Sequence, residues 1–264
     1  MLELCDIELG FSAVPLFSGL NLTIAPGEIC LLTAPSGAGK SSLLRWMAGL
    51  QTPGLRASGQ VRLGGQILSD LPAERRQLGL LFQTPLLFPH LTVADNLGFG
   101  LVATVTGAAR TNAIKEALAK AGLAGMGLRD PQTLSGGQQA RLALLRTLLA
   151  QPRALLLDEP FSSLDGGRRE EMVKLVREEA VKRKLPVLLV SHDRAFLNNV
   201  VTSTLAFEGN GLINQYVGGY DDWLRQRDAA ATSKQKSATS EKRVKPAKTG
   251  NSNKKLSQKA LTMF

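Results

Sequence analysis

Short apolar runs alternate with longer amphipathic stretches along the first 225 residues of the chain. The runs are rich in Leu and β-branched residues, and Gly or Pro breaks separate them from the helical patterns. This alternation is typical of α/β domains, in which helices connect largely parallel strands. We therefore predict an α/β fold built on a mostly parallel sheet.

Two regions depart from this alternation. Residues 1 to about 30 and residues 58–82 contain short alternating segments with Gly turns, such as LELCDIEL and GQVRLGGQIL. These patterns predict a separate small sheet of antiparallel strands. Residues from about 93 to 150 are rich in helical patterns, of which TNAIKEALAKAGL is the clearest. They predict a helical subdomain inserted into the domain.

The composition changes after Arg227. The chain carries a net charge of +10, and residues 228–264 hold nine Lys or Arg against two acidic residues, which accounts for +7 of it. A segment with so few large apolar residues cannot offset its chain entropy by burial. We predict one globular domain over residues 1–227 and a disordered basic tail over residues 228–264. Such a tail could bind nucleic-acid phosphates or remain a solvated extension without a dedicated partner.

Two further patterns bound the location of the protein. No apolar run approaches the ~20 residues that cross a bilayer, and the first residues lack the basic and apolar regions of a secretory signal. We predict a cytoplasmic protein. Cys5 and Cys30 each lie in an apolar strand-like segment, which favours buried reduced thiols over a disulfide or a metal site.

The strongest chemical signal is the segment APSGAGKSS, residues 34–42. It follows the apolar run EICLLT and precedes the helical pattern LLRWMA. A strand, a Gly-rich loop and a helix start in this order form a phosphate cradle lined by backbone N–H groups. Lys40 then reaches the β and γ phosphates of ATP, and Ser41 ligates Mg²⁺. The predicted cofactor-binding residues of this loop are Ser36, Gly37, Ala38, Gly39, Lys40, Ser41 and Ser42.

One position departs from the phosphate-loop pattern. Its first residue is usually Gly, and here it is Ala34. If the loop needs a positive φ at this position, the Cβ adds strain. The sequence then predicts weakened rather than abolished ATP binding.

A second signal is the segment ALLLDEP, residues 154–160, in which an apolar strand ends in two carboxylates. The end of such a strand lies beside the phosphate loop in P-loop folds. Asp158 is predicted to hold the Mg²⁺ ion with its water, and Glu159 to polarise the attacking water as a general base.

A third signal is LSGGQQARLALLRTLL, which begins at Leu134. Ser and two Gly stand at the start of an amphipathic helix, where bare backbone N–H groups form a second anion site. Two phosphate-binding helix starts in one chain indicate that the second serves the nucleotide of another molecule.

The segments APSGAGKSS, LSGGQ, LLLDEP, SSLD and SHD, in this order, resemble the motifs of ATP-binding cassette (ABC) ATPases. The resemblance covers roughly residues 1–210. It implies a P-loop NTPase core with a small antiparallel β subdomain and a helical subdomain. It also implies that the catalytic site closes only when a second cassette, here a second copy of the chain, packs against the first.

The resemblance assigns roles to further residues. Gln83 matches the Gln loop, where the family contacts both Mg²⁺ and the membrane subunits, and His192 matches the histidine that touches the γ-phosphate. Phe11, 29 positions before Lys40, matches the aromatic residue that stacks on adenine, where Tyr is more usual. An aromatic of the small-sheet core is the alternative for Phe11. The resemblance also implies contacts with the partner cassette. The γ-phosphate held by the partner would be contacted by Ser135, Gly136, Gly137 and Gln138. Asp165 matches the loop that crosses between the two cassettes.

Two parts of the chain, of unequal length, resemble different groups of the family. Residues 1–191 are similar to the ATP-binding subunits of bacterial importers of small solutes, which act through separate transmembrane permease subunits on the cytoplasmic face of the inner membrane. Residues 192–264 are similar to the end of ABC-F proteins, which act on ribosomes. Three hypotheses follow: an importer subunit, a soluble ABC-F-like factor, and a hybrid that does not function.

Overall fold

The computed structural model describes residues 1–11, 14–162, 164–192, 198, 201–209 and 212–228. Met1–Arg225 form one compact unit, and Gln226–Phe264 are assigned to a second. The tail predicted over residues 228–264 therefore lies, apart from Asp228, outside the described residues. The domain boundary stays a prediction.

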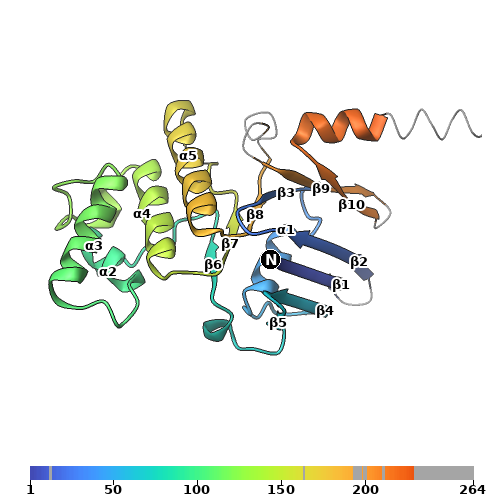
Figure 1. Cartoon of the computed structure of the whole chain (residues 1–264), viewed down its shortest axis with the longest axis horizontal. Coiled ribbons are helices and arrows are strands. Elements are labelled where there is room, and N and C mark those ends of the chain that lie inside the picture. Colours follow the sequence, from blue (N-terminus) through green and yellow to red (C-terminus); the bar gives the residue numbers. More distant parts are fainter. Residues whose placement is uncertain (12–13, 163, 193–197, 199–200, 210–211, 229–264) are drawn as a thin grey trace, which may run out of the picture. The chain divides into compact units, whose positions relative to one another are not determined.

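A six-stranded sheet forms the centre of the compact unit (Figure 1). Its strands stand in the order β10-β9-β3-β8-β7-β6, and the five from β9 to β6 are parallel to one another, whereas β10 is antiparallel to β9. The strands are β3 (Ile29–Thr33), β6 (Leu78–Leu81), β7 (Ala154–Asp158), β8 (Val187–Val190), β9 (Ser203–Gly209) and β10 (Leu212–Val217). Every residue of β3, β7 and β8 is buried, as the continuous apolar runs of a covered parallel sheet require.

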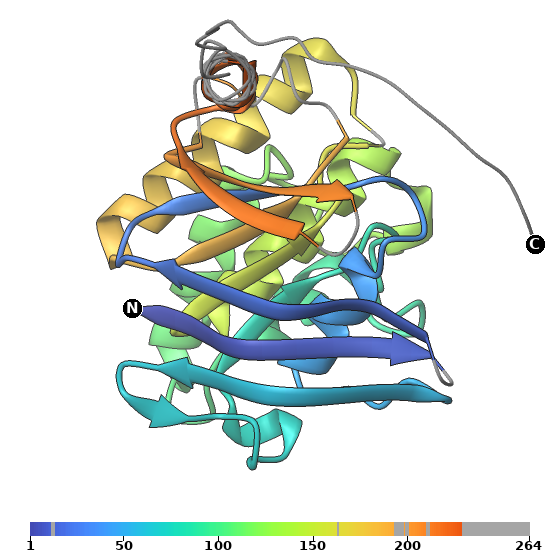
Figure 2. The same cartoon turned by 90° about the vertical axis from the view of Figure 1, so that its right-hand side faces the viewer.

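A second, antiparallel sheet lies beside the first, with its strands in the order β2-β1-β4-β5 (Figure 2). They are β1 (Leu2–Phe11), β2 (Val14–Ile24), β4 (Leu55–Leu63) and β5 (Gln66–Ile67). The predicted small β subdomain is thus confirmed, with one correction. Leu78–Leu81, assigned from sequence to this sheet, pairs in parallel with β7 instead. A short apolar run does not reveal its sheet by periodicity alone.

The central sheet is covered on both faces, and successive side chains of a strand pack against opposite layers. Cys30 and Leu32 of β3 face a cluster with the small sheet and helix α1 (Lys40–Met47), whereas Ile29 and Leu31 face the other helices. Burial raises the pKa of the Cys30 thiol to about 12, and Cys5 is half-buried. Both thiols are free of disulfides, and Cys30 packs as a core residue.

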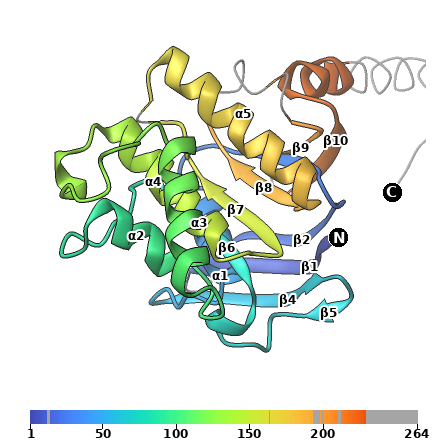
Figure 3. The same ribbon diagram turned by 60° about the vertical axis from the view of Figure 1, so that its left-hand side comes forward.

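Three helices form the helical region, and a fourth lies beside them (Figures 1 and 3). They are α2 (Val93–Gly100), α3 (Gly107–Lys120), α4 (Gly136–Leu149) and α5 (Gly166–Arg183), with short 3₁₀ turns at Ala73–Arg75 and Pro131–Thr133. Ion pairs join α5 to α4 and α3: Arg141 to Glu171 at 2.9 Å and Lys120 to Glu179 at 3.1 Å. No described helix is long and apolar enough to span a membrane.

Candidate functional site

The phosphate loop leaves the buried strand β3 and ends at the first residue of α1. Gly37 and Gly39 have φ of 80° and 89°, left-handed values that favour Gly. No side chain caps the N-terminus of α1, so its first backbone N–H groups remain available to an anion.

Side chains of the small sheet pack closely against this loop at Gly39. A Cβ placed on Gly39 would stand 2.7 Å from Leu16 Cδ1 of β2 and 3.4 Å from Leu9 Cδ2 of β1. Gly is therefore required at position 39 both for its backbone angle and for this close approach. Packing against the small sheet therefore helps to fix the position of the loop.

Lys40 is held inside the curve of the loop. Its Nζ donates hydrogen bonds to the carbonyl oxygens of Ala34 and Pro35, both at 3.0 Å, and the residue is only 8% exposed. The ammonium thus stays close to the backbone that would surround the phosphates. Ser41 is exposed and Ser42 half-buried beside it.

Ala34 is a correction to the sequence analysis. The residue is buried, and its φ is not positive. The strain expected from a Cβ at this position is therefore absent from the loop. Its carbonyl still accepts the Lys40 bond as a Gly carbonyl would.

The substitution Ala34→Gly should consequently fail to tighten ATP binding. Because Ala34 adopts an ordinary backbone angle, Gly gains nothing at this position and only increases the freedom of the unfolded chain. Calorimetric titration of both proteins with ATP should give equal affinities and a slightly lower melting temperature for Ala34→Gly. A clearly tighter affinity would restore the strain argument.

Asp158 and Glu159 stand where β7 ends, next to the end of β8. Asp158 is 8% exposed and pairs in register with Val190. Glu159 has a left-handed φ of 48°, and its N–H donates to the Val190 carbonyl at 3.0 Å. The left-handed angle turns the backbone between the two adjacent carboxylates.

The Glu159 carboxylate meets His192, which follows β8. Its Oε2 accepts a bond from the His192 N–H at 3.3 Å, and its Oε1 lies 3.5 Å from His192 Nε2. Burial raises the pKa of Glu159, and the contact with His192 opposes this rise. Oε1 has no hydrogen-bond partner, although its side chain is 12% exposed. A largely buried carboxylate with one acceptor oxygen that has no donor fits a water-polarising base.

Gln83 follows β6, which is parallel to β7 and pairs with it. It therefore lies at the same edge of the sheet as Asp158, and its side chain is exposed. Phe11 ends β1 and is 39% exposed, so it is not part of the small-sheet core. The exposure leaves a ring face available for stacking.

Ser135 starts α4 with a capping box. Its hydroxyl accepts from the Gln138 N–H at 3.4 Å, and its own N–H donates to Gln138 Oε1 at 2.9 Å. Gly136 is exposed, whereas Gly137 is buried, and a Cβ on it would stand 2.9 Å from Leu164 Cδ2. Asp165 caps α5 by accepting from the Arg168 N–H at 3.2 Å. The segment LSGGQ, Leu134 to Gln138, hereafter the signature segment, is therefore in contact with the start of α5.

Sequence reasoning missed two residues that hold the loop after Gln83. Asn96 is fully buried and bonds to the Phe88 N–H at 2.9 Å and to the Phe88, Leu91 and Thr92 carbonyls. Arg146 of α4 donates to the Leu86 carbonyl at 2.5 Å and stacks over the Phe88 ring. The only signal for them in the sequence was a polar residue, Asn96, at a helical position where burial is expected.

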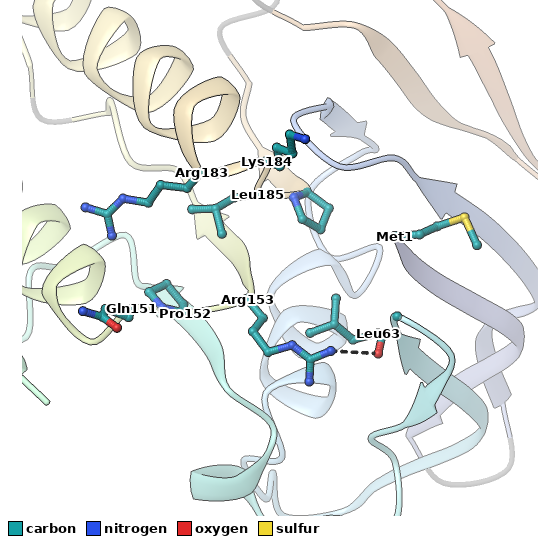
Figure 4. Close-up of a pocket in the computed structure, with 10 residues that line it drawn as sticks. Met1, Leu63, Gln151, Pro152, Arg153, Arg183, Lys184 and Leu185 are labelled. Carbon is teal, nitrogen blue, oxygen red and sulfur yellow. Dashed lines mark hydrogen bonds between the residues drawn. The ribbon is translucent and has the colours of Figure 1, made fainter.

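A cavity of about 510 Å³ lies at the opposite edge of the sheet, at the starts of β7 and β8 (Figure 4). Two of its three basic residues, Arg153 and Arg183, have structural partners. Arg153 donates to the Leu63 carbonyl and to Gln66, and Arg183 donates to the Leu148 carbonyl and pairs with Glu179. These two side chains thus join neighbouring elements across the cavity.

Fold and site together define a P-loop ATPase of the cassette type. The family described as ABC transporter matches residues 17–162, and the chain belongs to that family. It is an ATP-binding and ATP-hydrolysing cassette.

Relatives and a solved structure agree with this assignment. The uncharacterized ABC transporter ATP-binding protein YnjD of Escherichia coli K12 is 45% identical over 193 residues, 73% of this chain and 89% of its own length. The Fe(3+) ions import ATP-binding protein FbpC of Rhizobium etli is 41% identical over 72% of this chain. A dimeric cassette, MJ0796, bound to ADP and Pi after hydrolysis, superposes with a TM-score of 0.70 at 26% identity, covering 82% of this chain and 98% of that one.

The matches also limit what is carried over. The chain spans about half the length of the iron and polyamine import relatives: 53% of FbpC and 53% of the spermidine/putrescine import ATP-binding protein PotA of Hahella chejuensis, with PotA 39% identical. The resemblance of residues 192–264 to ABC-F proteins finds no support in these relatives. Most of that segment lies outside the described residues.

Proposed function

We propose that the protein is the energy-coupling subunit of an importer of small solutes, working as a pair of identical cassettes with separate membrane subunits. The observation that carries the proposal is the arrangement of Lys40, Glu159 and His192 at one edge of a cassette whose relatives include import ATP-binding proteins. The protein would act at the cytoplasmic face of the inner membrane.

One set of residues acts on the nucleotide bound to their own cassette. The backbone from Ser36 to Ser42 and the Lys40 ammonium bind the phosphates, and the exposed Phe11 ring stacks on adenine. Ser41, Gln83 and Asp158 would hold Mg²⁺ through the oxygen ligands that this ion prefers, and the ion would offset charge on the transferred phosphoryl group. Glu159 accepts the proton of the attacking water, and His192 holds that carboxylate in place.

A second set of residues acts on the nucleotide of the partner copy. Ser135, Gly136, Gly137 and Gln138 present a helix start, fixed by its capping box, to the partner's γ-phosphate. Asp165 lies in the segment that crosses between the two copies. Neither site is complete within one chain, which ties hydrolysis to closure of the pair.

A groove of about 530 Å³ is the proposed seat of the membrane subunit. It lies between β6, α2 and α4 and is lined by Phe88, Phe99 and Arg146 among others. Phe99 is 65% exposed although it is a large apolar residue. The groove shares Phe88 with the loop that begins at Gln83, so a segment docked there would contact the nucleotide-facing loop directly.

The test is to co-express the protein with permease subunits and measure its recovery in membranes and ATP-driven solute uptake. Phe99→Glu should abolish both while leaving ATP binding intact, because a charge replaces the exposed apolar ring that the docked segment would cover. Leu128→Glu is the matched control, since Leu128 is 90% exposed in the helical region and does not line the groove. Equal recovery of Phe99→Glu and the unmodified protein would contradict the docking assignment. Failure of the unmodified protein to join any membrane fraction would contradict the importer function.

A further inference from the structure

The first turn of α5 brings a basic side chain against the signature segment. A Cβ on Gly137 would stand 3.4 Å from Arg168 Cδ, so the aliphatic part of Arg168 lies beside the signature backbone. The Arg168 side chain is 50% exposed. Its guanidinium continues from this Cδ and pairs with Asp165, so the charge stands close to Gly137 at the start of α5.

The charge of Arg168 is poorly placed for the stability of its own helix. Arg168 lies in the first turn of α5, where the helix dipole is positive, and neither α4 nor α5 has an acidic residue in its first turn. A cation at this position raises the energy of the helix, whereas an anion lowers it. Asp165 supplies an anion at the start of α5, but the start of α4 has none, so that helix start and Arg168 together favour a negative group in front of Gly136.

The ion pair with Asp165 does not account for this placement. Arg168 Nη1 lies 3.4 Å from Asp165 Oδ2, but both side chains are at least half exposed, and exposed pairs contribute little. Asp165 caps the helix through the Arg168 backbone N–H, which any residue at position 168 would supply. The guanidinium itself is not needed for the cap.

We propose that Arg168 is a further binding residue of the shared ATP site, adding a cationic contact to the γ-phosphate held by the partner copy. The inference rests on the proposed two-copy mechanism and assigns it a residue outside the LSGGQ segment. An Arg guanidinium gives phosphate oxygens a full positive charge and a fork of N–H donors, whereas a helix start supplies backbone N–H groups with only a partial charge. Arg168 acts only across the interface and takes no part in ATP binding by a single cassette.

The experiment measures dimerisation by sedimentation in the Glu159→Gln background at saturating MgATP. Arg168→Gln keeps an extended polar side chain beside Gly137 but removes the charge. It should raise the protein concentration needed for dimerisation about tenfold, the effect of one charge-assisted contact that the closed pair shields from water. Arg168→Lys keeps the charge and should restore most of the affinity. ATP affinity measured on dilute monomer should be the same for all three.

Arg177→Gln is the matched control, because Arg177 is exposed on the same helix and its replacement causes the same loss of charge. It should dimerise like its parent. Equal dimerisation of Arg168→Gln and the parent, or an equal shift in Arg177→Gln, would overturn the inference. So would a matching loss of ATP affinity in the Arg168→Gln monomer. A parent that does not dimerise with MgATP would instead refute the two-copy mechanism on which the inference rests.

Discussion

Replacement of Glu159 by Gln should reduce ATP turnover by about 10²–10⁴-fold, the usual contribution of a positioned general base. The amide keeps an acceptor oxygen for the His192 N–H, so the local geometry should persist. Asp158 is unchanged, and nucleotide binding should therefore remain. ATP that binds but is not hydrolysed should hold two copies together, and sedimentation with MgATP should show a dimer that is absent without nucleotide.

Glu170→Gln is the control for this experiment, because Glu170 is exposed on α5 and the substitution makes the same chemical change. It should keep the parent's turnover. Undiminished hydrolysis by Glu159→Gln would contradict the role of Glu159 as base. A slow variant that stays monomeric with bound ATP would show that closure of the pair needs more than the nucleotide.

The second large effect is expected for Lys40→Met. The substitution removes a buried ammonium while keeping a side chain of similar length, and a charge-assisted contact to phosphate is lost. The loss should be about 3 kcal/mol, or roughly a hundredfold in ATP affinity. The Ala34 and Pro35 carbonyls also lose their donor, so the loop itself should become less ordered. Calorimetric titration with MgATP measures the first effect, and hydrogen exchange across residues 34–40 the second.

Arg45→Met tests whether any loss of charge on α1 has this consequence. Arg45 is exposed on the last turn of the helix and stacks over Phe82, away from the phosphate loop. Its replacement should leave ATP affinity unchanged. Comparable weakening in both variants would mean that the long-range field of α1, and not the Lys40 contact, attracts the nucleotide.

Much of the fold was predictable because its signals are local. The apolar runs before residues 34 and 158 are long enough to indicate buried strands, and the turns around Gly64 and Gly65 indicate a hairpin. The fate of Leu78–Leu81 was not predictable in this way. Its partner β7 lies more than seventy residues further along the chain, and strand pairing at that distance leaves no periodic trace in the sequence.

The residues of the candidate site were likewise predictable only where the signal is local. The phosphate loop is a contiguous segment, so its chemistry can be inferred from residue types alone. The contact between Glu159 and His192 depends on the register in which Asp158 meets Val190, and the left-handed angle of Glu159 is a tertiary outcome. The ordinary backbone angle of Ala34 could likewise be learned only from the folded chain.

The order of strands in the central sheet has a consequence for synthesis of the protein. The phosphate loop follows β3 near the beginning of the chain, but β8, which lies between β3 and β7, is made only at residues 187–190. A nascent chain has no catalytic edge until the ribosome has released most of the domain, since β3 and β7 stay unjoined without β8. Stabilisation of the domain by bound ATP is therefore expected only after β8 has been made.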